Sequence, residues 1–383
     1  MRLNTRLIHN GHVTDPSSGA LGVPLIQTST FDQSACFADP AGGQAPRYDY
    51  ARSGNPTRSA LEEIIAGLEG GECGYAFGSG IAAVSSALGI FSAGDHIVAA
   101  EDIYGGSYRI LNTFFKRWGL ELTAADASRP EQIRAAIRPN TRALYLETPS
   151  NPLLKITDLA ACIAIAKEAG LLSIVDNTFM TPCLQRPIEF GADIVLHSAT
   201  KFLGGHSDVI SGLAVTATKE LGKRLYAVQN GFGAVPGPWD VWLVIRGIKT
   251  LKVRLDAQQA AAQFLSRRLR EHPHVEAVYY PGLEDHPGKA VHDAQASGAG
   301  AVFSFKTKTV EQALGFLRRT KLAAAAVSLG GVETIASYPV RMSHASIPRP
   351  ERERLGITDT LIRISPGLED PEDLLEDFEQ ALA

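Results

Sequence analysis

The sequence predicts an α/β protein in which a large domain built on a mostly parallel sheet is followed by a smaller α+β domain. Apolar segments of strand length alternate with amphipathic helical patterns up to about Trp239, which is typical of a parallel sheet covered on both faces. Beyond that point the pattern changes to one long helix followed by dispersed strands. A chain of 383 residues also has the length of about two domains.

The first helix is expected to begin at Thr57 and to stop at the pair Gly70 and Gly71. The residues before it show little periodicity and many turn formers, so we expect an arm that wraps another domain or subunit. The alternating elements that follow are strands at 96–100, 143–147, 171–176 and 193–197, with helices at 81–91, 107–117 and 157–169.

The C-terminal pattern is a helix over 241–271 and strands at 275–280, 302–306 and 361–365. These elements predict three parts of the chain: an N-terminal arm (1–57) that contacts a neighbouring subunit, a large cofactor domain (58–240) and a C-terminal domain (241–383).

The composition is that of a soluble globular protein, with 45% hydrophobic and 20% charged residues and a net charge of −4. So small a charge gives no reason to expect nucleic acid or an anionic membrane as a partner. The uncharged stretch 73–94 is long enough to span a bilayer, but its glycines and serines favour a turn and a buried helix. The four cysteines are dispersed, so we expect no disulfide framework, and a reducing cytoplasm is the favoured location. The histidines lack ligand spacing with cysteines or carboxylates, so we expect no metal site.

Polar residues follow two of the expected strands at the point where each strand ends. Asp176 closes one of them, and Ser198, Thr200 and Lys201 follow another. Ligands of an open parallel sheet bind at this edge. The run Gly78-Ser79-Gly80 opens a helix whose free amide groups suit a phosphate. Together these features favour pyridoxal phosphate, which needs a lysine to form a Schiff base and a carboxylate to keep its pyridine nitrogen protonated.

Each residue has an ordinary structural interpretation when taken alone. Lys201 is then a solvated surface lysine, Asp176 a cap or an arginine partner, and Tyr104 a packing aromatic. The glycine run has a rival function, because 78–83 also fits the G-x-G-x-x-A pattern of a nicotinamide oxidoreductase, with acidic residues about twenty positions further on. The strand expected before it is very short, and that alternative gives Asp176 and Lys201 no role.

Eight motifs occur in order along the chain: YARSGNPTR (50–58), GSG (78–80), YGG (104–106), ETPSNP (147–152), VDNTF (175–179), SATK (198–201), SLGG (328–331) and LIRISPGLED (361–370). Together they resemble the Cys/Met-metabolism family of pyridoxal-phosphate enzymes, the trans-sulfuration lyases and synthases. The resemblance spans nearly the whole chain. It implies the fold type I architecture of these enzymes.

The resemblance also implies roles for individual residues. Lys201 would form the Schiff base and shuttle the substrate proton, Asp176 would face the pyridine nitrogen, and Tyr104 would stack on the ring. The phosphate would be bound by Gly80, Ile81, Ser198 and Thr200 of the same subunit and by Tyr50 and Arg52 of a neighbour. Arg363 would bind the α-carboxylate of an amino-acid substrate, with Ser328 and Asn151 assisting. A cytoplasmic homotetramer, a dimer of dimers with shared active sites, is the implied assembly.

Departures from the family patterns favour cystathionine β-lyase activity. The residue before the SLGG motif is Val327, where γ-lyases and γ-synthases have a glutamate; Gly106 stands where methionine γ-lyases have a cysteine; and Asp49 is not the glutamate typical of γ-lyases. The run 342–348 looks most like β-lyases of bacillar and plant type. A cystathionine γ-lyase, or a γ-synthase that uses an O-acylated homoserine, remains the alternative, because all these reactions begin with the same Cα carbanion.

Overall fold

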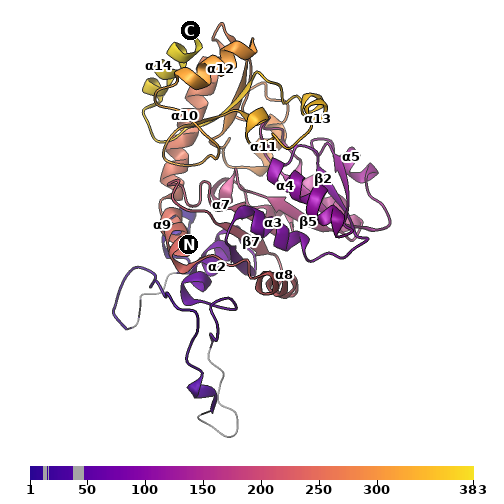
Figure 1. Cartoon of the computed structure of the whole chain (residues 1–383), viewed down its shortest axis with the longest axis vertical. Helices are drawn as coiled ribbons and strands as arrows, with labels where there is room; N and C mark the ends of the chain where they lie inside the picture. The colour runs from indigo at the N-terminus through magenta and orange to yellow at the C-terminus, as the bar shows by residue number, and fades with distance from the viewer. Residues whose placement is uncertain (12–14, 16, 38–46) are drawn as a thin grey trace.

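The computed structural model describes residues 1–11, 15, 17–37 and 47–383. It contains two sheets, each with helices packed against it (Figure 1). The larger sheet has the strand order β1-β7-β6-β5-β4-β2-β3. Its strands are β1 (Cys73–Phe77), β2 (His96–Ala100), β3 (Glu121–Ala125), β4 (Thr141–Glu147), β5 (Leu172–Asp176), β6 (Ile194–Ser198) and β7 (Gly212–Thr216). Strand β7 is antiparallel to both of its neighbours, β1 and β6, and the remaining pairs in this sheet are parallel.

The helices of this part of the chain are α1 (Leu3–His9), α2 (Pro56–Glu69), α3 (Gly80–Leu88), α4 (Gly105–Ile110), α5 (Pro130–Ala135), α6 (Leu159–Glu168), α7 (Thr181–Leu184), α8 (Lys219–Phe232) and α9 (Pro238–Ile248). Short turns η1 (Ser34–Phe37), η2 (Leu111–Phe115) and η3 (Pro187–Phe190) accompany them. Local chemistry sets their ends: the Asn55 side chain accepts from the backbone N–H groups of Thr57 and Arg58 at the start of α2, and Gly70 ends it with φ 85°.

The second sheet has the order β10-β11-β12-β9-β8 and is antiparallel apart from the β10–β11 pair. Its elements are α10 (Leu251–Arg270), β8 (Val275–Tyr279), α11 (Lys289–Gln295), β9 (Phe303–Thr307), α12 (Val310–Arg319), β10 (Ala324–Ala325), β11 (Ile335–Ser337), η4 (Pro339–Arg341), α13 (Arg349–Arg354), β12 (Leu361–Ser365) and α14 (Pro371–Leu382). Helix α10 takes part in both hydrophobic cores: Leu255 is buried in the core of the large sheet, and Leu265 and Leu269 are buried in that of the second sheet.

The long helix expected over 241–271 is wrong: the chain forms α9 and α10 with a break between them. The carbonyl of Gly247 accepts from the backbone N–H of Thr250 at 3.2 Å and from Arg254 Nη2 at 2.8 Å. These bonds turn the chain after Ile248. The helix expected over 107–117 begins earlier, at Gly105, and changes to a π turn at Leu111.

The N-terminal segment that carries η1 extends away from the body of the subunit (Figure 1). Phe37 is 83% exposed there, and Leu21 is also exposed. The predicted division of the chain into three parts at 57 and 240 stays a prediction. Among the described residues, no helix combines the length and the apolarity that crossing a bilayer requires.

Candidate active site

The carboxyl ends of β4, β5 and β6 open into a cavity of about 1280 Å³. The register pairs Asp176 with Glu147 of β4 and with Leu196 of β6, which brings side chains far apart in the sequence to one sheet edge. We call five residues at these ends and at the start of α3 the cavity floor: Gly80, Asp176, Ser198, Thr200 and Lys201. All of them line the cavity, as the sequence predicts for a site at this edge.

Asp176 is held by hydrogen bonds from its own loop. Thr178 donates to Asp176 Oδ1 from its hydroxyl at 2.6 Å and from its backbone N–H at 3.0 Å. The same hydroxyl accepts from the backbone N–H of Ser198 at 2.8 Å, which ties β5 to β6. Burial raises the pKa of Asp176, while the Thr178 hydrogen bonds and the nearby His197 act in the opposite direction.

The Lys201 amine lies in the same cavity and donates to Ser328 Oγ at 2.7 Å. Burial, with a smaller contribution from the positive charge of Arg363, lowers the pKa of Lys201 to about 8. About one amine in ten is therefore neutral at pH 7, far more than for a solvated lysine, and a nucleophile or a base requires the neutral form.

Arg363, in β12 of the second sheet, lines the cavity and is almost fully buried. Its Nη1 donates to Asn151 Oδ1 at 3.0 Å, and its Nη2 donates to the Ser328 carbonyl at 2.6 Å and to Ser337 Oγ at 3.1 Å. Burial lowers its pKa to about 10, and its buried Nε has no partner among the described residues. The guanidinium is thus fixed in place and retains capacity to bind an anion.

Ser328 links these two cationic groups. Its φ of 90° lies in the left-handed region, which is a strained conformation for a residue with a side chain. In that conformation its hydroxyl meets Lys201 and its carbonyl meets Arg363.

The start of α3 approaches β6 so closely that only glycine fits at position 80. A Cβ atom on Gly80 would lie 2.7 Å from Ser198 Cβ. The Ser79 side chain caps the helix by accepting from the backbone N–H of Ala82. The N-terminal amide groups of the nine-residue α3 and the Ser198 and Thr200 hydroxyls therefore border the same space, which suits a phosphate.

Another part of the cavity wall is formed by residues that we call the cavity rim: Tyr104, Val327, Met342, Ser343 and Ser346. Tyr104 is 43% exposed, and its backbone N–H donates to Glu147 Oε2 at 2.8 Å. Gly105 packs directly on the run 342–346, because a Cβ atom there would lie 2.0 Å from the Ser343 carbonyl oxygen. The rim therefore joins the loop after β2 to the C-terminal part of the chain.

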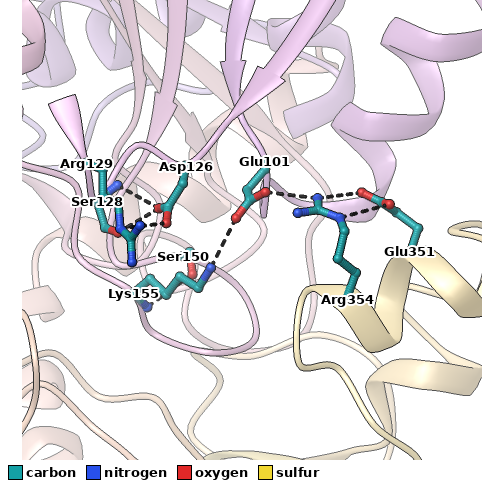
Figure 2. A network of polar contacts seen from close by, with 8 residues as sticks. All are labelled: Glu101, Asp126, Ser128, Arg129, Ser150, Lys155, Glu351 and Arg354. Atoms are coloured by element: carbon teal, nitrogen blue, oxygen red, sulfur yellow. Dashed lines mark hydrogen bonds and ion pairs between the residues drawn. The ribbon is translucent and has the colours of Figure 1, made fainter. Parts of the chain in front are cut away.

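An ion-pair network supports this junction (Figure 2). Glu101, directly after β2, accepts from Arg354 Nη2 at 2.9 Å through one oxygen and from Lys155 Nζ at 3.3 Å through the other. Arg354, the last residue of α13, also pairs with Glu351 at 2.7 Å. The network thus connects α13, which follows the run 342–346, to the loop that carries Tyr104.

Tyr50 and Arg52 do not line this cavity. They border a separate hollow of about 250 Å³, beside residues 233–238 of the same chain. Arg52 Nη1 donates to the backbone carbonyl of Asn230 at 2.8 Å and to its Oδ1 at 2.7 Å. Every other predicted site residue (Gly80, Ile81, Tyr104, Asn151, Asp176, Ser198, Thr200, Lys201, Ser328 and Arg363) lines the large cavity.

A model of the family "Cys/Met metabolism PLP-dependent enzyme" matches residues 4–383. The chain belongs to this family. It is 53% identical to the cystathionine β-lyase MetC of Bacillus subtilis, over 99% of this chain and 96% of that one, and 52% identical to the cystathionine γ-lyase of the same organism, over 100% and 99%. The crystal structure of cystathionine γ-lyase from Lactobacillus plantarum complexed with L-serine superposes with a TM-score of 0.96 at 44% identity, covering 100% of this chain and 98% of that one.

These findings confirm the predicted family, the fold and the dependence on pyridoxal phosphate. The residues present fit this cofactor: the space that a Cβ on Gly80 would fill lies at a helix N-terminus, and a partly neutral lysine and a hydrogen-bonded aspartate line the same cavity. The oxidoreductase alternative is wrong. In the structure, β1 is an edge strand paired antiparallel to β7, whereas a dinucleotide fingerprint needs a parallel βαβ unit.

Two further groups that the sequence analysis did not single out also line the cavity. Glu147 ends β4 beside Asp176, and burial together with the charge of Asp176 raises its pKa well above the usual range. Arg109, in α4, is an exposed cation in the cavity wall. The motif quoted for Glu147 contained it, but nothing local in the sequence indicates that Arg109 turns toward the site.

Proposed function

We propose that this enzyme is a cystathionine β-lyase, which converts L-cystathionine and water to homocysteine, pyruvate and ammonia. The observation that supports the β reaction is the environment of Val327. This side chain is 62% exposed and lines the cavity directly beside Ser328, so the position usually occupied by a glutamate in the γ-enzymes presents an apolar group to the substrate. A distal ammonium group gains no ionic partner at this position.

The relatives support the same class of reaction without separating its members. Cystathionine β-lyases of Bacillus subtilis and Lactococcus lactis are among the similar proteins, but the γ-lyase of Bacillus subtilis is almost as similar as the β-lyase. We therefore retain γ-elimination, which yields cysteine and 2-oxobutyrate, as the second candidate.

We assign the chemical roles to residues of the cavity floor and of the second sheet. When bound, pyridoxal phosphate supplies the aldehyde that captures the substrate amine and the ring that accepts the electrons released at Cα. Asp176 would hold the ring nitrogen, and Gly80, Ile81, Ser198 and Thr200 would hold the phosphate. Tyr104 would hold the ring.

Arg363 binds the substrate α-carboxylate, helped by Asn151 and Ser328. This orients the Cα–H bond toward Lys201, whose neutral amine takes the Cα proton. We propose that either the Lys201 ammonium so formed or the Tyr104 hydroxyl protonates the departing sulfur.

The test is a product-resolved assay of the full-length holoenzyme with L-cystathionine. Pyruvate and homocysteine in equal amounts are expected. Formation of 2-oxobutyrate and cysteine without pyruvate would reject the β-lyase and leave the γ-lyase.

We further propose that the N-terminal arm, 1–57, completes the active site of a neighbouring subunit in a cytoplasmic homotetramer made of two dimers. The position of Tyr50 and Arg52 outside their own cavity supports this, as do the exposed apolar side chains of the extended segment. Mixing Arg52→Ala chains with Lys201→Ala chains tests the shared site. Recovery of activity on mixing two inactive preparations is expected, and a mixture without activity would contradict the proposal.

A further inference from the structure

A buried glutamine of α10 holds two segments that carry site residues. Gln258 is 0% exposed, and its Nε2 donates to the Gly331 carbonyl at 2.6 Å and to the Pro366 carbonyl at 3.2 Å. Gly331 ends the SLGG motif, which begins at Ser328. Pro366 directly follows β12, the strand that carries Arg363. Gln258 itself is not among the described residues that line the cavity.

The two acceptors determine which end of the Gln258 amide faces these segments. An amide nitrogen carries two N–H donors, and both neighbours are carbonyl oxygens, so each donor has one acceptor. Gln258 Oε1 is buried and has no hydrogen-bond partner among the described residues. An unpaired buried oxygen costs stability, and an apolar side chain of similar size would avoid that cost. The two donors are therefore what this position supplies.

The SLGG motif is packed against the large sheet and against β12. Leu329 is buried in the core of the large sheet. A Cβ atom on Gly330 would lie 2.6 Å from the backbone nitrogen of Phe202, the residue after Lys201. The backbone N–H of Gly330 donates to Ser365 Oγ at 2.8 Å. The motif therefore contacts the turn that carries Lys201 on one side and the end of β12 on the other.

Gln258 lies where α10 passes from one hydrophobic core to the other. Leu255, three residues earlier, is buried in the core of the large sheet, and Ala262, four residues later, is buried in that of the second sheet. Hydrogen bonds from this point of the helix fix the SLGG motif and the segment after β12 relative to both sheets. Such a fixed position matters because the motif contacts residues of both.

Ser328 needs this support because a φ of 90° is strained for a residue with a side chain. In this conformation its hydroxyl accepts from Lys201 and its carbonyl accepts from Arg363. We propose that Gln258 is a positioning residue that holds Ser328 in this conformation and thereby orients the Arg363 guanidinium toward the substrate α-carboxylate. The inference rests on the proposed function, in which Arg363 binds that carboxylate.

The test is Gln258→Met in full-length holoenzyme, because methionine has a similar size and no donor. We expect KM for L-cystathionine to rise about fivefold, the effect of weakening one hydrogen bond to a charged group. The dissociation constant of pyridoxal phosphate should change little, because the residues assigned to its phosphate lie outside the SLGG motif. A crystal structure of the variant should show Ser328 with a negative φ and its hydroxyl beyond hydrogen-bond reach of Lys201.

Gln263→Met is the matched control. Gln263 lies on the same helix, and its Nε2 donates to the Gly282 carbonyl at 3.3 Å. Neither residue is among those that line the cavity in the described part of the chain, so this variant should leave KM unchanged.

Three results would overturn the inference: an unchanged KM in Gln258→Met, a Ser328 φ that stays positive, or a loss of cofactor affinity as large as the rise in KM, which indicates a general loosening of the site. Arg363→Met separates these results from failure of the proposed function. If Arg363→Met raises KM and Gln258→Met does not, only the inference about Gln258 is wrong. If KM stays the same in Arg363→Met as well, the assignment of Arg363 itself is wrong.

Ser365→Ala covers the case in which Gln258→Met does not fold. It removes the hydroxyl that accepts from Gly330, so it loosens the same motif from β12 while α10 stays intact. KM for L-cystathionine should again rise, and calorimetry reports whether the variant is folded. A folded Ser365→Ala enzyme with wild-type KM would contradict the proposal, because holding the motif would then not govern substrate binding.

Discussion

The floor and the rim of the cavity are built in different ways. The floor consists of strand ends and a helix N-terminus of one sheet, and its groups are fixed by short hydrogen bonds within two adjacent loops, such as those of Thr178 to Asp176 and from Ser198. The rim joins segments from distant parts of the chain, and partly exposed ion pairs support it (Figure 2). Buried hydrogen bonds to charged groups are strong, whereas exposed ion pairs contribute little.

This difference indicates that the chemistry of the reaction and the selectivity for the substrate depend on different parts of the cavity. The floor holds the groups needed for any reaction that begins by removing the Cα proton. The rim, which includes Val327 and the run 342–346, borders the space for the rest of the substrate. Substitutions in the floor should therefore remove activity, and those in the rim, apart from Tyr104, should redirect or weaken it.

The largest expected effect is that of Lys201→Ala. Loss of the amine that binds the aldehyde and takes the Cα proton should lower turnover of cystathionine by about 10⁴-fold or more. Lys155→Ala, which removes the partly buried lysine of the rim network, is the matched control and should cost less than about fivefold. Residual turnover of Lys201→Ala within tenfold of wild type would show that the floor does not carry the chemistry.

The pH dependence of cofactor capture by the apoenzyme tests the floor a second way. Burial and Arg363 lower the pKa of Lys201 to about 8, so the reactive neutral amine accumulates as the pH rises through that value. The rate of pyridoxal phosphate binding should rise about tenfold from pH 7 to 9 and then level off, because roughly one amine in ten is already neutral at pH 7. Stopped-flow absorbance measures this rate, and a rise that continues beyond pH 10 would indicate an ordinary, solvated lysine.

In the rim, Val327→Glu should change selectivity rather than abolish activity. The new carboxylate lies beside Ser328 in the cavity, where it can pair with a distal ammonium group. We expect a several-fold lower KM for cystathionine. We also expect 2-oxobutyrate to form a larger share of the product, a change on the order of 1 kcal/mol in the preference between γ- and β-elimination. Val327→Gln, which has similar size without charge, should show neither change; equal behaviour of the two variants would argue against a charge effect.

The smallest expected effect is that of Arg354→Met, which removes the cation between Glu101 and Glu351. Because the partners are partly exposed, we expect KM to rise about threefold with kcat nearly unchanged. The difference in KM between variant and wild type should shrink at high salt, because salt weakens the ion pairs of the wild type. Steady-state kinetics at two ionic strengths measures this. A large fall in kcat would mean that the rim network also positions groups of the floor.

The sequence predicted the floor well because its residues stand where an apolar strand ends or a helix begins, and such ends meet at one edge of a parallel sheet. Asp176 ends a mostly apolar strand, and Ser198, Thr200 and Lys201 lie within four positions of one another at the end of the next strand. Contacts over long separations were not predictable in this way. Glu69 and His197 are 128 positions apart, and only the packing of α2 against the large sheet brings them together.

The missed elements have physical reasons too. β3 is half-exposed with an irregular burial pattern, so its five residues lack the continuous apolar run of the central strands. The break between α9 and α10 comes from tertiary hydrogen bonding at Gly247, which leaves no signal in helical periodicity.

Helix α10 has a consequence for how the subunit comes apart. Its 20 residues contribute Leu255 to one core and Leu265 and Leu269 to the other, so neither core keeps a complete wall when its counterpart melts. Heat should then unfold both halves in a single calorimetric transition. A destabilising core substitution in one half should lower the stability of the other half as well, because both cores include residues of α10.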